Sequence, residues 1–158
     1  MADASDSRVV GQDSKMMPEL RNFVLFQTDL FVYHQRDVDI DRWFVGGDCA
    51  GWFYMRLLLM DRIQPDREPV MEDWGWTFAV SAREIRVRVN VWSYSIDNCW
   101  IFGLETKPTL MQRISSKLTL QAKGIVANAI ERIITTEPRI NKHVWSSENP
   151  WDTGIERF

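Results

Sequence analysis

The sequence has few of the residues on which most enzyme and metal sites depend. It contains two cysteines, Cys49 and Cys99, and two histidines, His34 and His143. The cysteines form no CxxC pair and no zinc spacing, and both lie among apolar residues, so we expect buried thiols in a reducing compartment. Neither histidine lies in a nucleophile motif such as GxSxG. The sequence therefore predicts a protein that is not an enzyme, with no catalytic residue, no metal ligand and no cofactor.

Long apolar runs and an excess of positive charge are also missing. Leu57–Met60 is among the longest apolar runs, far short of a membrane span, and residues 1–18 lack the apolar core of a signal peptide. The net charge is −3 and the pI is about 5.4, whereas a general nucleic-acid binder needs a basic face. We therefore expect a cytoplasmic protein with no membrane partner and no direct contact with nucleic acid.

Tryptophan, by contrast, is abundant. The chain of 158 residues carries eight tryptophans, and 45% of its residues are hydrophobic. A chain of this length and composition can bury an aromatic core without disulfides or metals. The polar composition of residues 1–18 predicts a disordered N-terminal segment, and residues 19–158 are expected to form a single domain.

Alternating apolar residues predict the strands of a sheet. Residues 22–35 are rich in β-branched and aromatic side chains and predict one or two strands, broken near Thr28. Three runs of period two, at 76–80, 85–91 and 100–104, predict an antiparallel meander. Residues 140–145 suit a short edge strand. The sequence therefore predicts an antiparallel sheet of three to five strands.

Two helices are expected to cover this sheet. The first, about 48–63, follows Gly46-Gly47 with Asp48 as its N-cap, and its apolar residues lie on most faces, so we expect it to be largely buried. Pro65 and Pro69 then predict a loop over 64–72. The second helix, about 117–136, has apolar residues at helical spacing and ends before Pro138. The expected fold class is α+β.

Aspartates alternate with apolar residues at Asp37, Asp39 and Asp41, which places three carboxylates on one side of an extended chain. The spacing is similar to the start of a calcium loop, but Arg42 occupies the sixth position, where that loop needs glycine. We therefore predict no metal here. A solvated strand face and an acidic patch that docks a basic partner both remain open.

Two other charged pairs have simple interpretations. Glu72 and Asp73 are adjacent, so on an extended chain they point in opposite directions and do not converge like the two acids of a glycosidase. Arg86 and Arg88 share a strand face with Trp92, an arrangement that can bind single-stranded nucleic acid. Two arginines in an acidic chain favour packing of their stems over the sheet instead.

The order of several features resembles a known group of proteins. It is carried by Trp52 and Leu57-Leu58-Leu59 after the glycine pair, then by Glu72-Asp73-Trp74-Gly75-Trp76, Trp100–Glu105, Glu137–Ile140 and Trp145. Over about residues 45–145, the chain is similar to small bacterial immunity proteins of polymorphic-toxin systems (contact-dependent inhibition, type VI secretion). The resemblance implies a cytoplasmic protein that binds a cognate toxin and blocks its active site.

Toxins that are nucleases are basic, so the resemblance implies an acidic, phosphate-mimicking surface. The residues expected to bind the partner are Asp37, Asp39, Asp41, Trp43, Glu72 and Asp73. Trp43 or Trp74 would be an aromatic anchor if exposed, although for Trp74 a place in the core is the prediction. Two alternatives stay open: a small-molecule-binding or enzymatic α+β module with a cleft between sheet and helices, and an oligomeric scaffold protein with an exposed aromatic patch.

Overall fold

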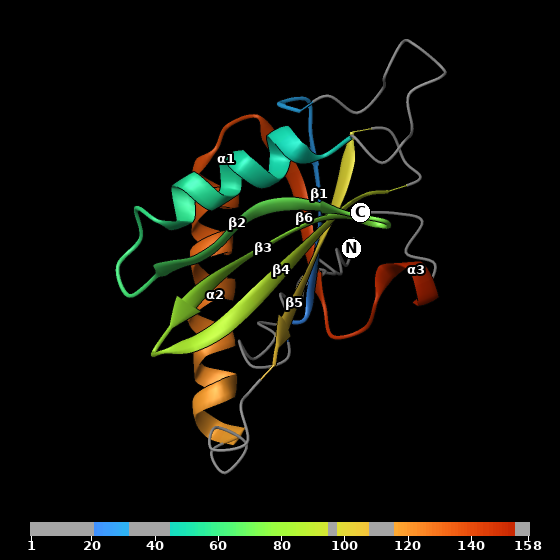
Figure 1. The fold of residues 1–158 in the computed structure, drawn as a ribbon. Coiled ribbons are helices and arrows are strands. Elements are labelled where there is room, and N and C mark those ends of the chain that lie inside the picture. Colours follow the sequence, from blue (N-terminus) through green and yellow to red (C-terminus); the bar gives the residue numbers. More distant parts are fainter. Residues whose placement is uncertain (1–20, 32–44, 95–97, 108–115, 154–158) are drawn as a thin grey trace, which may run out of the picture.

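A six-stranded antiparallel sheet forms the centre of the protein (Figure 1). The structure, a computed structural model, describes residues 21–31, 45–94, 98–107 and 116–153. The strand order is β2-β3-β4-β5-β1-β6, and every neighbouring pair is antiparallel. The strands are β1 (Phe23–Thr28), β2 (Gln64–Glu72), β3 (Gly75–Ala82), β4 (Ile85–Ser93), β5 (Cys99–Thr106) and β6 (Ile140–Ser146). The α+β class is confirmed, but the sheet has more strands than the three to five predicted.

The predicted meander is β3-β4-β5. Val87, Val89 and Val91 of β4 alternate toward one face of the sheet and are buried, because the side chains of a strand alternate between its two faces. β3 and β4 pair in continuous register from Trp76↔Val91 to Ala82↔Ile85. β1 ends at Thr28, where the sequence predicted a break, and β6 is the predicted edge strand.

Residues 64–72 form β2, so the predicted loop is wrong. Pro65 and Pro69 lie within an edge strand, where a residue without an N–H is tolerated because only one side of the strand pairs with a neighbour. The pairing of β2 with β3 shifts register twice, between Pro65 and Arg67 and between Arg67 and Val70. Most side chains of β2 are exposed on both faces of the sheet, so its sequence does not alternate between apolar and polar residues.

Both long helices, α1 (Gly47–Leu57) and α2 (Ser116–Thr136), lie on the same face of the sheet (Figure 1). α2 matches its prediction, whereas α1 ends six residues before the predicted 63. After Leu57 the chain makes a tighter turn, in which Met60 N–H donates to the Leu57 carbonyl at 3.0 Å. Arg62 then adopts a left-handed φ of 68°, which directs the chain into β2.

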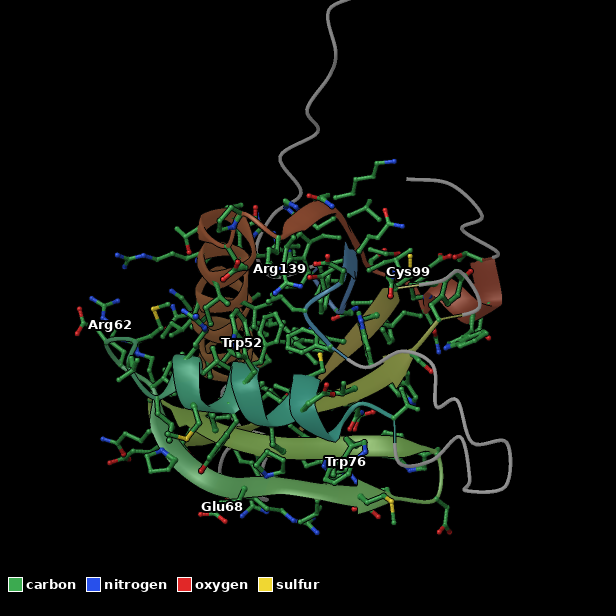
Figure 2. All side chains as sticks on the ribbon, turned by 90° about the horizontal axis from the view of Figure 1, so that it is seen from above. Trp52, Arg62, Glu68, Trp76, Cys99 and Arg139 are labelled. Carbon is green, nitrogen blue, oxygen red and sulfur yellow. The ribbon has the colours of Figure 1, made fainter. Side chains whose placement is uncertain are left out.

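The start of α1 also differs from its prediction. Asp48 is not the N-cap, because Gly46 takes that place with a φ of 114° and no side chain caps the helix. A Cβ on Gly47 would lie 2.7 Å from the Trp76 indole, so the glycine pair lets α1 approach β3 closely (Figure 2). The helix is only partly buried, since Met55 is 62% exposed, and Leu59, in the turn that follows the helix, is 84% exposed.

Aromatic rings fill the space between the helices and the sheet. Phe53 of α1 lies 5.4 Å from Phe26 and 4.6 Å from Phe102, measured between ring centroids. Phe26 and Phe102 meet edge to face at 5.0 Å. Trp100 is fully buried in the same core. These contacts join α1 to the central strands, as the tryptophan and phenylalanine content led us to expect.

The opposite face of the sheet carries a smaller buried cluster. It contains Leu25, Tyr94, Cys99 and Ile101, with Phe23, Trp92 and Val144 packed against it. The short helix α3 (Pro150–Thr153) lies beside this cluster, and the rings of Trp151 and Tyr94 are 4.8 Å apart. This ring contact docks the C-terminal segment on the sheet. Both cysteines are buried thiols, as predicted.

Candidate functional site

An exposed tryptophan marks the face of the sheet that α1 and α2 leave uncovered. Trp74 lies in the two-residue connection between β2 and β3 and is 41% exposed, so its predicted place in the core is wrong. Its ring packs on Trp92 of β4 with centroids 5.3 Å apart and planes inclined by 43°. The reason for its exposure is that Trp92 occupies the inner position and leaves Trp74 the outer one.

Glycine gives Trp92 this inner position. A Cβ on Gly103 of β5 would lie 2.9 Å from Cζ3 of Trp92, closer than real Cβ contacts allow. The Trp92 ring therefore lies against the backbone of β5 at Gly103 and also contacts the Trp74 ring. Because Trp92 contacts both Gly103 of β5 and the Trp74 ring, the orientation of Trp74 is fixed before any partner binds.

The turn that carries Trp74 depends on Gly75. Glu72 pairs with Gly75, which leaves Asp73 and Trp74 as a two-residue hairpin loop. Gly75 has a φ of 153°, and a Cβ there would lie 2.6 Å from the Val91 carbonyl oxygen. Only glycine fits this position without strain. The glycine in the Trp-Gly-Trp segment thus allows the hairpin to pack on β4.

Acidic residues flank the exposed indole. Asp73 is exposed in the hairpin loop, and a Glu72 carboxylate oxygen lies 3.7 Å from an Arg67 guanidinium nitrogen of the same strand. The structure therefore places these two predicted partner-binding residues next to Trp74. The other four, Asp37, Asp39, Asp41 and Trp43, lie outside the described residues.

Charged residues line a hollow at the other end of the same sheet face. It has a volume of about 240 Å³ and lies among Asp66, Ser81, Glu84, Arg86, Arg88, Glu105 and Lys107. Asp66 pairs with Arg86 at 2.5 Å and accepts a hydrogen bond from Ser81 Oγ at 3.0 Å. The Arg86 guanidinium holds the pKa of Asp66 below its ordinary value. Acid and base thus neutralise each other there. Arg86 lies on β4 and Asp66 on β2, so the Arg86 side chain extends across β3 to reach its partner. The predicted packing of the Arg86 and Arg88 stems over the sheet stays a prediction.

The second histidine, His143, contacts a carboxylate on the helix side of the sheet. Its Nε2 lies 3.1 Å from Oε1 of Glu131 on α2, and the other oxygen of Glu131 accepts a hydrogen bond from Trp145 Nε1 at 2.6 Å. None of these three residues lines the hollow above. The cluster ties β6 to α2. His34 lies outside the described residues.

Three features bear on metal binding, thiol chemistry and membrane insertion in the described ranges. Within them, no group of three or more histidine, cysteine, aspartate or glutamate residues is placed to hold a metal ion. Burial raises the pKa of the Cys49 thiol well above its ordinary value, which disfavours the reactive thiolate. Across the same ranges, no helix has the length and apolar character that crossing a membrane requires.

Comparison of the chain with protein-family models, curated proteins and solved structures finds no match. The site is therefore interpreted from its geometry. Sequence reasoning missed the role of Trp92 and Gly103. The available signal was that Trp92 shares a strand face with Arg86 and Arg88, which placed an indole on the polar side of β4.

Proposed function

We propose that this protein acts by binding another protein, through a surface centred on Trp74 and flanked by Glu72 and Asp73. The observation that carries the proposal is the exposed indole of Trp74, supported from below by Trp92 on Gly103. Tryptophan dominates binding energy at interfaces, and a side chain already held in place loses less entropy on binding. The partly exposed Trp74 indole, held in place by its contact with Trp92, suits such an anchor.

For the partner, we propose a bacterial toxin, which would make this chain a cytoplasmic immunity protein. The resemblance over residues 45–145 supports this choice. The net charge of −3 and the acids beside Trp74 favour a basic partner, such as a nuclease, because opposite charges speed the encounter. Asp37, Asp39, Asp41 and Trp43 stay in the proposed surface. Inhibition requires only binding, so no catalytic residue is proposed.

The first test is capture of the product of the adjacent upstream gene by the tagged full-length chain. A complex is expected, and Trp74→Ala should weaken it by about 30-fold or more, the loss of at least about 2 kcal/mol typical of an anchor residue. Trp151→Ala is the matched control, because Trp151 is also exposed, at 50%, but lies on α3. Equal weakening by both substitutions, or no complex with any neighbouring toxin, contradicts the proposal.

The acidic flank is tested by kinetics rather than by affinity alone. Asp73→Ser should slow association with the toxin at low ionic strength and leave dissociation nearly unchanged, because an exposed charge acts mainly on the encounter. Raising the salt to about 0.5 M should remove most of the difference, since screening then acts over a few ångströms. A difference that persists unchanged at high salt argues against electrostatic attraction.

A further inference from the structure

The two edges of the sheet are built differently. β2, at one edge, contains two prolines, two register shifts and exposed charged residues, which are devices that prevent another strand from pairing. β6, at the other edge, contains no proline, and its pairing with β1 is regular from Ser146 to Lys142. Among the described residues, the edge formed by β6 is therefore open to a further strand, while the edge formed by β2 is protected.

The hydrogen bonds of β1 show which backbone groups of β6 point outward. Thr28 N–H donates to the Asn98 carbonyl, so the even-numbered residues of β1 bond toward β5. Asn22, just before β1, bonds both ways: its carbonyl accepts from Leu104 N–H, and its N–H donates to the Ser146 carbonyl. The odd-numbered residues Phe23, Leu25 and Gln27 then bond toward β6, opposite Ser146, Val144 and Lys142.

It follows that the N–H and C=O groups of His143 and Trp145 point away from β1. Their side chains still point to the helix side, where both contact Glu131. In the part of the chain that the structure describes, no strand pairs with this outer row of groups. Such a row is a ready template for one more strand.

We propose that the strand added here is β6 of a second copy of this chain, antiparallel, with Val144 on the two-fold axis. In this register Val144 lies opposite itself, His143 lies opposite Trp145, and Lys142 lies opposite Ser146. The two His143–Trp145 pairs then exchange four backbone hydrogen bonds. On one face of the sheet, the β-branched Val144 meets its own copy and the Lys142 ammonium group meets the Ser146 hydroxyl. On the other face, the His143 ring meets the Trp145 ring, and no like charges lie opposite each other.

Neighbouring registers fit less well. A shift that places Lys142 on the axis sets two ammonium groups directly opposite each other, and a shift that places His143 there sets two imidazoles opposite each other. A shift that places the axis between two residues, such as His143 and Val144, would pair residues whose side chains point to opposite faces of the sheet. A two-fold axis perpendicular to the sheet does not allow this pairing. The pattern of β6 is thus self-complementary about Val144. A single strand pair is a small interface, so dissociation constants of about 1 μM to 1 mM are expected.

The register is tested by cross-linking of the full-length chain. Val144→Cys places two thiols at a non-hydrogen-bonded pair, where Cα atoms are about 4.5 Å apart and disulfides form. Under mild oxidation it should give a disulfide-linked dimer. Ser146→Cys is the control, because the two copies of residue 146 lie about 13 Å apart in this register. The native Cys49 and Cys99 are buried and do not compete.

Charge at the same edge tests the contact without any covalent bond. In sedimentation velocity over a concentration series, Ser146→Lys should weaken dimerisation by about 2- to 30-fold, since it sets two like-charge pairs against Lys142. Ser146→Glu should strengthen it by a similar factor. Trp74→Ala should leave the dimer unchanged, which separates this proposal from the proposed function. A chain that stays monomeric to about 1 mM, or a dimer insensitive to these variants, overturns the proposal.

Discussion

Trp92 and Gly103 are packed so closely that one methyl group added to Gly103 would lie 2.9 Å from the indole. The two residues come from neighbouring strands, β4 and β5, and share the face of the sheet that α1 and α2 do not cover. The Trp74 ring packs against Trp92 with centroids 5.3 Å apart and planes inclined by 43°. The exposed position of Trp74 thus depends on Gly103, because the absence of a side chain at Gly103 leaves room for the Trp92 ring against which Trp74 packs.

Gly103→Ala should therefore destabilise the fold by about 1–3 kcal/mol, because the new methyl group forces Trp92 out of place. In the background Trp92→Ala, the same substitution should cost less, since the closer of the two rings it meets is gone and only Phe23, at 3.1 Å, remains. Urea denaturation of the four proteins measures this coupling. Gly51→Ala is the control: nothing lies within 4 Å of a Cβ at this site in α1, so a gain of about 0.5–1 kcal/mol is expected. Additive effects of the two substitutions contradict the contact.

Trp92→Ala and Trp74→Ala should differ in their effect on stability. Trp92 packs against the smaller buried cluster, and its loss should cost about 2–4 kcal/mol. Trp74, at 41% exposure, should cost less than about 1 kcal/mol. Chemical denaturation with tryptophan fluorescence measures both values. If Trp74→Ala proves the more damaging of the two, Trp74 has a structural role and the proposed anchor is wrong.

Asp66 should make stability depend on acid pH. Because the Arg86 guanidinium and the Ser81 hydroxyl hold the pKa of Asp66 below its ordinary value, the pair stabilises the fold fully above the unfolded pKa of about 3.9. That stabilisation is lost as the pH falls through the lower folded pKa. Asp66→Asn should cost less than about 1 kcal/mol at pH 7, since Arg86 is half exposed.

The difference between the wild type and Asp66→Asn should hold from pH 7 to about pH 5 and shrink as the pH falls below the unfolded pKa of about 3.9. Urea midpoints across this range measure it. Asp73→Asn, in the exposed hairpin loop, is the control and should leave the midpoint unchanged throughout. A difference for Asp66→Asn that grows as the pH falls has the wrong sign for this ion pair.

Both thiols should be slow to react in the native protein. Cys49 and Cys99 are fully buried, and burial raises the pKa of Cys49, so little thiolate meets the solvent. With a chromogenic disulfide reagent, we expect at least about a 100-fold slower reaction in buffer than in denaturant, because modification must wait for opening of the structure. Rapid labelling of one thiol in buffer shows that its surroundings open independently of the rest.

Much of the architecture was predictable because burial repeats with the period of each element. Val87, Val89 and Val91 alternate in β4, and α2 carries its apolar residues at helical spacing, so both were predicted within a residue or two of their observed bounds. β2 was missed because an exposed edge strand has no buried side to produce alternation. Its prolines suggested a loop, although an edge strand tolerates them.

The candidate site was harder to predict, because it depends on contacts between distant segments. Whether Trp74 is buried depends on Trp92 and Gly103, and their proximity follows from the register of β3, β4 and β5. No local pattern around Trp74 carries that information. Glu72 and Asp73 lie next to this tryptophan because they are its neighbours in sequence, and their role in binding a partner stays a prediction.

The prolines of β2 also set a limit on growth. A sheet with two unprotected edge strands could add further copies at both edges and grow into a fibril. A sheet with one unprotected edge strand forms only a closed dimer. Replacing Pro65 and Pro69 would weaken that protection, so these two residues help to keep the protein a soluble closed dimer.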